Sequence, residues 1–327
     1  MKIQSITLLL CLTLNGFIAH AGNTPSTELT KEGEKVAPQK STLKQIMPEF
    51  LYSYIDFDFD STEGGNFNRF QGHSNVYSVG ADHIILTPSI MAGLYVFKVD
   101  SDVNSQFFLA PESDNYSTQS IRNNTLFGHV RKSFTPNFDI DLGYGYGQNK
   151  IASQTLFFPN RVNQVMGYTS HRTTNWFGSL NGFYKTSWDK WMLRANLGLL
   201  YSRINAGRYY LNLPALQTAQ LIAPLTNKAT YVFEGAELSY QLTPQFIPFI
   251  NGGLIQVAGF SNSRPLVTPL FNGSLPQLNL DQNGYRVGGG ITYLYKQLVL
   301  RLEQKYYNAG NNYKSNQTIV GLEYHFS

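Results

Sequence analysis

The chain has 327 residues, of which 42% are hydrophobic and only 14% are charged, whereas soluble domains carry roughly 25% charged residues. The net charge of +4 is spread along the sequence without a Lys/Arg cluster, which argues against nucleic acid as a partner. The mean hydropathy of −0.23 is too polar for a helical membrane protein. No long apolar run follows residue 20, so transmembrane helices are excluded.

The N-terminal residues have the layout of a secretory signal peptide. Lys2 precedes an apolar stretch at residues 6–18, and Ala19-His20-Ala21 provides a small-x-small cleavage site. A lipoprotein signal around Cys11 is a weaker interpretation, because Leu10 is too large for that site. Cleavage after Ala21 would remove the only cysteine, which is typical of a bacterial exported protein. We therefore expect a signal peptide at residues 1–21.

The remaining sequence divides into a polar segment and one uniform domain. Residues 22–46 contain prolines, lysines and glutamates, and we expect a periplasmic or lumenal linker there. Residues 47–327 form a single domain of short alternating stretches separated by turn-rich segments. The alternation is clearest at 138–147, 193–202, 285–293, 298–305 and 320–326. A period of two places apolar side chains on one face of a strand and Gly, Asn or charged residues on the other.

The connections between these stretches alternate between short and long. Tight turns are predicted at Thr87-Pro88, Thr135-Pro136-Asn137, Trp188-Asp189-Lys190, Thr243-Pro244-Gln245 and Tyr295-Lys296-Gln297. Longer loops are predicted at about 60–73, 101–123, 148–172, 205–229, 258–283 and 308–314. This order requires twelve strands with both termini on one side, whereas the connections of a soluble sandwich do not sort this way. The prediction is an all-β, antiparallel twelve-stranded transmembrane β-barrel with short periplasmic turns and long extracellular loops.

Aromatic residues support the barrel. They gather at the short-turn ends, where a membrane-interface girdle belongs, and comprise Trp188, Trp191, Tyr240, Phe246, Tyr293, Tyr295 and Phe326. Strands in lipid must satisfy every backbone hydrogen bond, so the sheet must close on itself.

Two stretches resemble the autotransporter translocator barrel family. Residues 77–86 carry a Gly-x-Asp strand, followed by a turn and Ala92-Gly93-Leu94-Tyr95, as at the opening of that barrel. Residues 320–326 resemble its Gly-Leu-x-Tyr-x-Phe terminus, although Ser327 follows Phe326. The resemblance covers about 45–327. It implies a Gram-negative outer membrane, with Phe326 as the signal that the barrel-insertion machinery reads.

The family resemblance also implies what surrounds the barrel. Family members anchor an exported passenger domain, but only about 25 polar residues precede the first strand here, so we expect a barrel without a passenger. By the same resemblance, residues 23–46 would occupy the lumen as the family's linker does.

Charged residues on the polar faces of the strands are predicted to line the lumen. They are Asp82, Arg131, Asp139, Asp141, Arg194, Arg286, Arg301, Glu303, Lys305 and Glu323. Mixed signs indicate either a lumen closed by salt bridges or a weakly selective aqueous pore, since selective pores carry one sign. The pair Arg301–Glu303 and Glu323 are the best placed for ion pairing.

Candidate catalytic and metal-binding groups do not combine into a site. His73-Ser74-Asn75 invites comparison with twelve-stranded outer-membrane phospholipases, but adjacent residues on a strand point to opposite faces. The other histidines are scattered without ligand spacing, so neither a metal nor a cofactor is predicted. The alternating Asp56, Asp58 and Asp60 lack the Gly and Glu of a calcium loop and are expected on strand one, facing water inside the barrel.

The predicted loops repeatedly carry apolar residues that run into proline. We expect Phe107, Phe108, Phe157, Phe158, Leu213, Leu221 and Leu266 to form a cap above the barrel mouth or a surface that contacts a partner. The chain is therefore expected to be a non-enzymatic surface protein or passive pore of the autotransporter type. Adhesion to a surface ligand through the loops is the alternative, and lipid hydrolysis is a weaker one. The expected partners are outer-membrane lipid and the insertion machinery, with a surface ligand as the further partner that the adhesion alternative requires.

Overall fold

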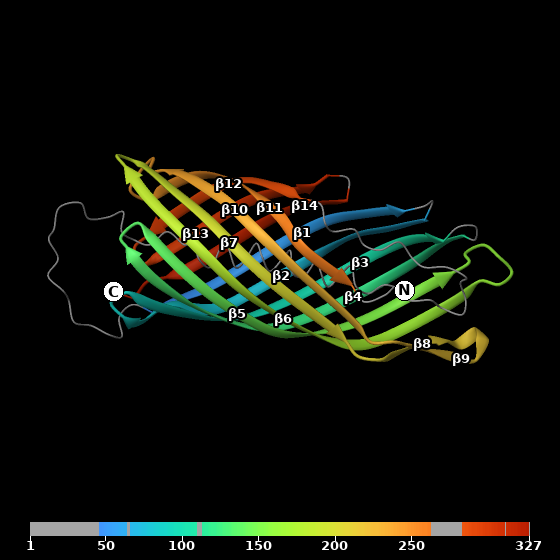
Figure 1. Cartoon of the computed structure of the whole chain (residues 1–327). Helices are drawn as coiled ribbons and strands as arrows, with labels where there is room; N and C mark the ends of the chain where they lie inside the picture. The colour runs from blue at the N-terminus through green and yellow to red at the C-terminus, as the bar shows by residue number, and fades with distance from the viewer. Residues whose placement is uncertain (1–45, 64–65, 110–112, 263–282, 311, 327) are drawn as a thin grey trace.

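A computed structural model describes residues 46–63, 66–109, 113–262, 283–310 and 312–326. Within these ranges, twelve strands close into an antiparallel barrel, and two further strands form a hairpin beyond its wall (Figure 1). The barrel strands are β1 (Met47–Glu63), β2 (Asn66–Thr87), β3 (Ile90–Leu109), β4 (Ser113–Thr135), β5 (Phe138–Phe157), β6 (Val165–Trp188), β7 (Trp191–Ala206), β10 (Leu225–Tyr240), β11 (Phe246–Asn262), β12 (Gly284–Tyr295), β13 (Leu298–Ala309) and β14 (Tyr313–Tyr324). The predicted signal peptide and nearly all of the linker lie outside the described residues.

The barrel closes where its first strand meets its last. β1 pairs antiparallel with β14, from Glu49 opposite Glu323 to Phe59 opposite Tyr313. The other barrel strands pair with their neighbours in sequence, and β7 pairs with β10 across the hairpin β8 (Tyr209–Leu213) and β9 (Thr218–Ile222). Closure leaves the twelve barrel strands without an open edge, which strands in lipid require. The predicted fold class is confirmed. No helix among these residues is both long and apolar enough to span a membrane.

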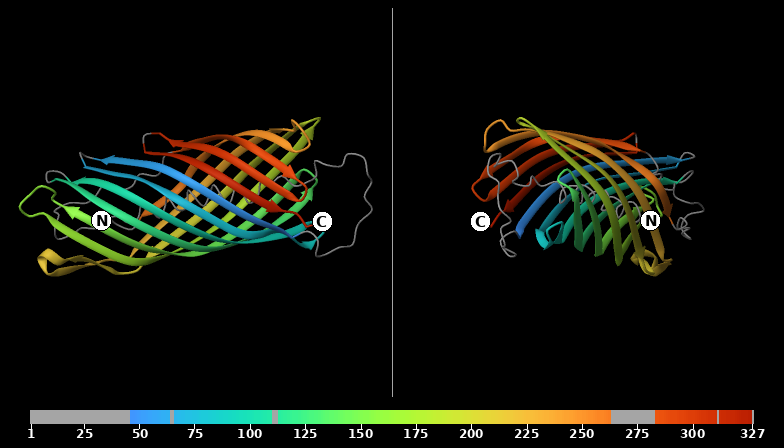
Figure 2. Two further views of the ribbon diagram at one scale, coloured as in Figure 1. Left: turned by 180° about the vertical axis from the view of Figure 1, so that it is seen from behind. Right: turned by 60° about the vertical axis from the view of Figure 1, so that its left-hand side comes forward.

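The short turns lie where they were predicted, but most of the predicted loops are not loops. β4 and β6 have 23 and 24 residues, more than twice the 9–11 that cross a bilayer. The strands therefore run far beyond the membrane at the end opposite the short turns, on the right of Figure 1 and the left of the rear view in Figure 2. Segments 101–123 and 148–172, predicted as loops, are mostly the outer parts of β3, β4, β5 and β6.

The strands reverse their polarity along their length, as β5 shows. Near the short turns its outward residues are Phe138, Ile140, Leu142, Tyr144 and Tyr146, and farther along they are Gln148, Lys150, Ala152 and Gln154. The inward face changes in the opposite sense, from Asp139, Asp141 and three glycines to Ile151 and Phe157. Lipid surrounds the first part and water the second, so each part turns its apolar face away from water.

This reversal corrects one prediction about strand one. Asp56, Asp58 and Asp60 lie on β1, as predicted, but they point outward rather than into the lumen. The alternate residues Phe57 and Phe59 point inward and are buried. The aspartates lie in the part of β1 beyond the membrane, where the water is on the outside of the wall.

The inward apolar residues of this outer part pack into a distal core. It includes Phe57, Phe70, Val103, Phe107, Phe157, Leu211, Leu213, Leu225 and Tyr231. Phe107 and Phe157 contact each other edge to face, with ring centroids 6.4 Å apart. A sheet that continues into water must bury one face, and the interior of the barrel is the only side shielded by neighbouring strands.

The distal core also corrects the predicted loop cap. Phe107 and Phe157 lie on strands, Phe158 directly follows β5, and Leu213 ends β8; all four are buried inside the wall rather than above a mouth. Phe108 points outward and stacks on Phe67 at 5.7 Å. Leu221 is exposed, and Leu266 lies outside the described residues. These residues belong to strands or to their ends because apolar side chains recur at inward-facing positions of the outer parts of the strands.

The hairpin β8–β9 projects beyond the ends of β7 and β10, beside the outer end of β6 (Figure 1). A short 3₁₀ helix (Pro214–Leu216) joins its two strands. Its Tyr209 ring stacks on His171 of β6, with centroids 4.0 Å apart. Burial raises the pKa of the Tyr209 phenol, so the phenol stays neutral where the hairpin contacts the barrel wall.

Candidate functional site in the barrel lumen

All ten charged residues predicted to line the lumen point inward, in the half of the barrel nearest the short turns. Seven are buried, namely Asp82, Arg131, Asp139, Asp141, Arg301, Glu303 and Glu323. Arg194, Arg286 and Lys305 are partly buried. The structure brings most of them into two clusters on different parts of the wall.

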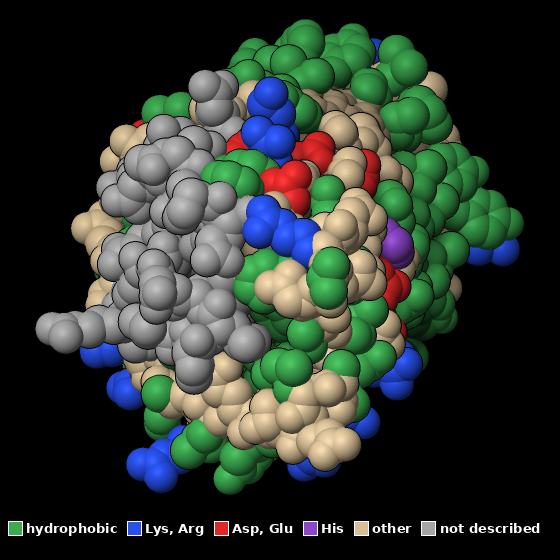
Figure 3. Space-filling view, turned by 90° about the vertical axis from the view of Figure 1, so that its right-hand side faces the viewer, with side chains coloured by type: hydrophobic (Ala, Val, Ile, Leu, Met, Phe, Trp, Pro, Cys, Tyr) green, Lys and Arg blue, Asp and Glu red, His purple; other side chains and the backbone are tan. Residues whose placement is uncertain are grey.

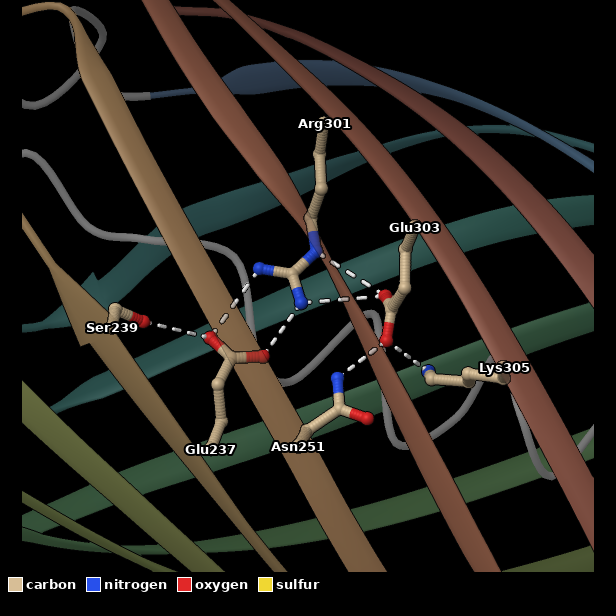
Figure 4. Close-up of polar contacts among 6 residues, drawn as sticks. All are labelled: Glu237, Ser239, Asn251, Arg301, Glu303 and Lys305. Carbon is tan, nitrogen blue, oxygen red and sulfur yellow. Dashed lines mark hydrogen bonds and ion pairs between the residues drawn. The ribbon is translucent and has the colours of Figure 1, made fainter.

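The first cluster centres on the Arg301 guanidinium of β13 (Figure 4). It donates to both carboxylate oxygens of Glu237 on β10, with Nη2–Oε2 at 2.6 Å and Nη1–Oε1 at 3.3 Å. Nη2 also lies 3.3 Å from Oε2 of Glu303. The guanidinium stacks over the Phe249 ring of β11, 3.6 Å from its centroid. This bidentate, stacked geometry is one that arginine provides and lysine does not.

The second oxygen of Glu303 completes this cluster. It accepts from Lys305 Nζ at 3.0 Å and from Asn251 Nδ2 at 2.6 Å. The Ser239 hydroxyl donates to Glu237 at 3.4 Å. The two carboxylates pair with Arg301 and Lys305, and two further cations, Arg194 and Arg286, line the same space, so no carboxylate of this cluster lacks a cation. The space that these side chains and neighbouring wall residues enclose is about 20 Å³, room for about one water molecule.

The second cluster lies across β1 to β5. His129 Nδ1 is 2.6 Å from Asp141 Oδ2, and its Nε2 is 3.4 Å from Asp82 Oδ1. Arg131 Nε is 3.4 Å from the same Asp141 oxygen. The Tyr95 hydroxyl donates to Glu49 at 2.9 Å. Here too, carboxylates meet cationic or hydrogen-bonding side chains, either on the next strand or across one strand of the wall.

Sequence reasoning missed four members of these clusters: Glu49, Tyr95, His129 and Glu237. The alternation on their strands was less regular, but each stands an even number of residues from a predicted lumenal residue or a buried neighbour. Glu237 is two residues from the inward Ser239, and His129 is two residues from Arg131. Parity along the strand was the signal that would have identified them.

Some predicted lumenal residues lie apart from the clusters. Glu323 does not join Arg301 but lies beside His325, with Nε2–Oε1 at 2.5 Å. Asp139 is inward and buried near the β4–β5 turn. Phe326, the predicted insertion signal, is exposed just beyond β14, with its ring 5.0 Å from that of Tyr324.

The phospholipase-like residues do not assemble. The Ser74 hydroxyl is buried in the lumen 2.7 Å from that of Ser101, whereas His73 points outward, 3.7 Å from Asp102. Within the described ranges, no group of three or more His, Cys, Asp or Glu residues is arranged to hold a metal ion.

An apolar outer belt, aromatic girdles and a charged lumen define a transmembrane β-barrel of the bacterial outer-membrane type. The sequence model of the autotransporter β-domain matches residues 54–303. The chain belongs to the autotransporter β-domain family, whose barrels lie in the Gram-negative outer membrane.

Solved structures share the fold. The translocator domain of the autotransporter NalP from Neisseria meningitidis aligns with a TM-score of 0.65 at 14% identity, covering 86% of this chain and 88% of that one. The β domain of Bordetella BrkA aligns with a TM-score of 0.57 at 11% identity, covering 86% of this chain and 99% of that one. The transport unit of the autotransporter AIDA-I from Escherichia coli aligns with a TM-score of 0.52 at 11% identity, covering 95% of this chain and 97% of that one. No curated protein matches the sequence.

Proposed function

We propose that this autotransporter-type barrel is a non-enzymatic outer-membrane protein whose lumen is a narrow passive pore with weak ion selectivity. The observation that carries the proposal is the mixing of charge signs in the lumen, where the carboxylates of Glu237 and Glu303 pair with Arg301 and Lys305. A pore selective for cations or anions presents a ring of one sign. A wall of paired charges remains wettable while attracting neither kind of ion strongly.

Inward glycines support the pore, because residues without a side chain add no bulk of their own to the lumen. A Cβ at Gly145 would collide with the Phe177 ring, and one at Gly288 would come within 2.9 Å of Lys305 Cγ. Both glycines are thus covered by a side chain of the neighbouring strand.

Planar-bilayer recording across a KCl gradient tests the proposal. The refolded chain should show small, steady conductance with a reversal potential near zero. Glu303→Gln removes a lumenal negative charge and should shift the reversal potential toward the anion value. Asp102→Asn, which removes an exposed carboxylate outside the lumen, is the matched control and should cause no shift. Strong selectivity of the unchanged chain would contradict the proposal.

The route to the membrane is part of the same proposal. Export through a signal peptide at residues 1–21 and recognition of Phe326 by the barrel-insertion machinery would deliver the barrel to the outer membrane. The exposure of Phe326 beside the last strand supports the second step.

Adhesion is the second candidate function, and the β8–β9 hairpin favours it. Tyr210, Leu216 and Leu221 are 56%, 47% and 49% exposed on this projecting element. Exposed apolar residues on a protruding element often mark contact surfaces. An adhesin needs no open lumen, so the absence of conductance from correctly folded barrels would favour adhesion over the pore.

A further inference from the structure

Three basic residues form a row across the outer surface of the barrel. Arg122 of β4 is the direct register partner of Lys150 on β5, and Lys150 is the direct partner of Arg172 on β6. All three side chains point outward and are exposed. Directly opposite residues of neighbouring strands have Cβ atoms about 5 Å apart, so three positive charges lie in one short line.

This row has no internal compensation. Within the described part of the chain, none of the three side chains forms an ion pair or a hydrogen bond. Asp100 of β3 lies opposite Arg122, but its carboxylate pairs with Lys98 at 2.8 Å. The outward positions of β5 and β6 carry no Asp or Glu. Like charges placed directly opposite one another destabilise a sheet, so the row is unfavourable for the isolated barrel.

The height of the row on the barrel is set by the aromatic residues below it. On each of the three strands, the residue four positions closer to the short turns also pairs with its neighbours, and these residues are Leu126, Tyr146 and Trp176. Trp176 contacts Tyr144 and Tyr201, with ring centroids 6.4 and 5.1 Å away. Trp and Tyr gather at the membrane–water interface. Four residues span about 13 Å along a strand, so on tilted strands the cations stand at the outer edge of the headgroup layer.

We propose that Arg122, Lys150 and Arg172 bind the phosphorylated headgroup of a lipid in the outer leaflet. Arginine forms bidentate hydrogen bonds to phosphate, and lysine supplies a point charge between the two guanidinium groups. The acyl chains of the same lipid lie against the apolar belt directly below. The proposal rests on the membrane position of the barrel and not on an open pore.

The charge distribution of the outer part agrees with this site. Asp56, Asp58 and Asp60 lie on β1, on another sector of the wall, while the partners Arg203 and Lys228 continue the basic surface on β7 and β10. Figure 3, which faces the right-hand end of Figure 1, shows blue Lys and Arg side chains around the lower rim and red carboxylates mainly in the upper half. An anionic headgroup on β5 and β6 therefore meets outward positions that carry no carboxylate.

The experiment compares lipid retention by two triple variants of the full chain. Arg122→Gln/Lys150→Gln/Arg172→Gln removes the row, and Lys132→Gln/Lys190→Gln/Lys296→Gln removes the same charge from exposed positions at the short-turn end. Native mass spectrometry in detergent measures binding of diphosphoryl lipid A. We expect at least tenfold weaker binding by the row variant and unchanged binding by the control. Lys150→Gln alone should weaken binding several-fold.

Three results would overturn the proposal. Equal losses in the two triple variants would mean that only net charge matters. Equal binding of lipid A and its fully dephosphorylated form would mean that phosphate is not recognised. Inorganic pyrophosphate that displaces lipid A at equal concentration would assign the row to free phosphate instead of a lipid. Heat-dependent mobility on gels verifies the fold of each variant, and the exposed positions make loss of folding unexpected.

Discussion

Replacing Arg301 by Gln is expected to lower the free energy of unfolding by about 3–5 kcal/mol, because it leaves buried charges without their partner. Glu237 would lose both of its contacts to the guanidinium, and Glu303 would lose its contact to Nη2 while it keeps those to Lys305 and Asn251. The side chains of Arg301 and Glu237 are 5% and 6% exposed, so little water reaches them to replace the lost contacts. Urea-dependent unfolding in lipid vesicles measures the effect.

The double variant Glu237→Gln/Arg301→Gln is the control for this prediction. It removes both charges together, and Glu303 keeps its contacts to Lys305 and Asn251. Because a buried pair replaced as a whole costs little, most of the lost stability should return. A double variant as unstable as Arg301→Gln would show that the pair contributes through packing, for instance on Phe249, and not through charge compensation.

Replacing Phe157 by Ala is expected to destabilise the part of the barrel beyond the membrane by about 3–5 kcal/mol, as a large cavity forms in a packed core. Phe157 is 1% exposed and packs against Phe107. The membrane-spanning part has its own hydrogen-bonded wall, so the loss should be local. Limited proteolysis of barrels in vesicles should show faster cleavage near residues 158–164 while the membrane-embedded part stays protected.

Gln154→Ala is the matched control, since Gln154 lies on the same strand and points into water. It should leave the cleavage rate unchanged. Equal cleavage of the Phe157→Ala variant and the unchanged chain would mean that the distal core does not hold the outer strands together.

The sequence was sufficient to predict the closed barrel, its five tight turns and the inward direction of the lumenal charges. Four of the five tight turns carry Pro, Asn or Asp, and strands such as residues 138–147 keep a strict period of two, so local chemistry specified both. Closure followed from the requirement that strands in lipid pair every backbone group.

The outer halves of the strands could not be predicted as easily, because alternation alone does not say which face meets water. Beyond Tyr146 the residues still alternate, but the apolar residues now occupy inward positions, and this change of phase resembles the end of a strand. The same ambiguity placed Phe157 in a loop and Asp58 in the lumen. The contacts of Glu237 and His129 depend on strands distant in sequence, which no local pattern reports.

The central claim is that the outward face of each strand passes from lipid to water just beyond the aromatic row. Nitroxide labels at Leu142, Tyr146, Lys150 and Gln154, in a Cys11→Ser background, test it along one face of β5. Collisions with oxygen report lipid, and collisions with a water-soluble nickel chelate report water. The account predicts high oxygen and low nickel accessibility at residue 142, with the reverse at residues 150 and 154. Oxygen accessibility at residue 154 equal to that at residue 142 would contradict it.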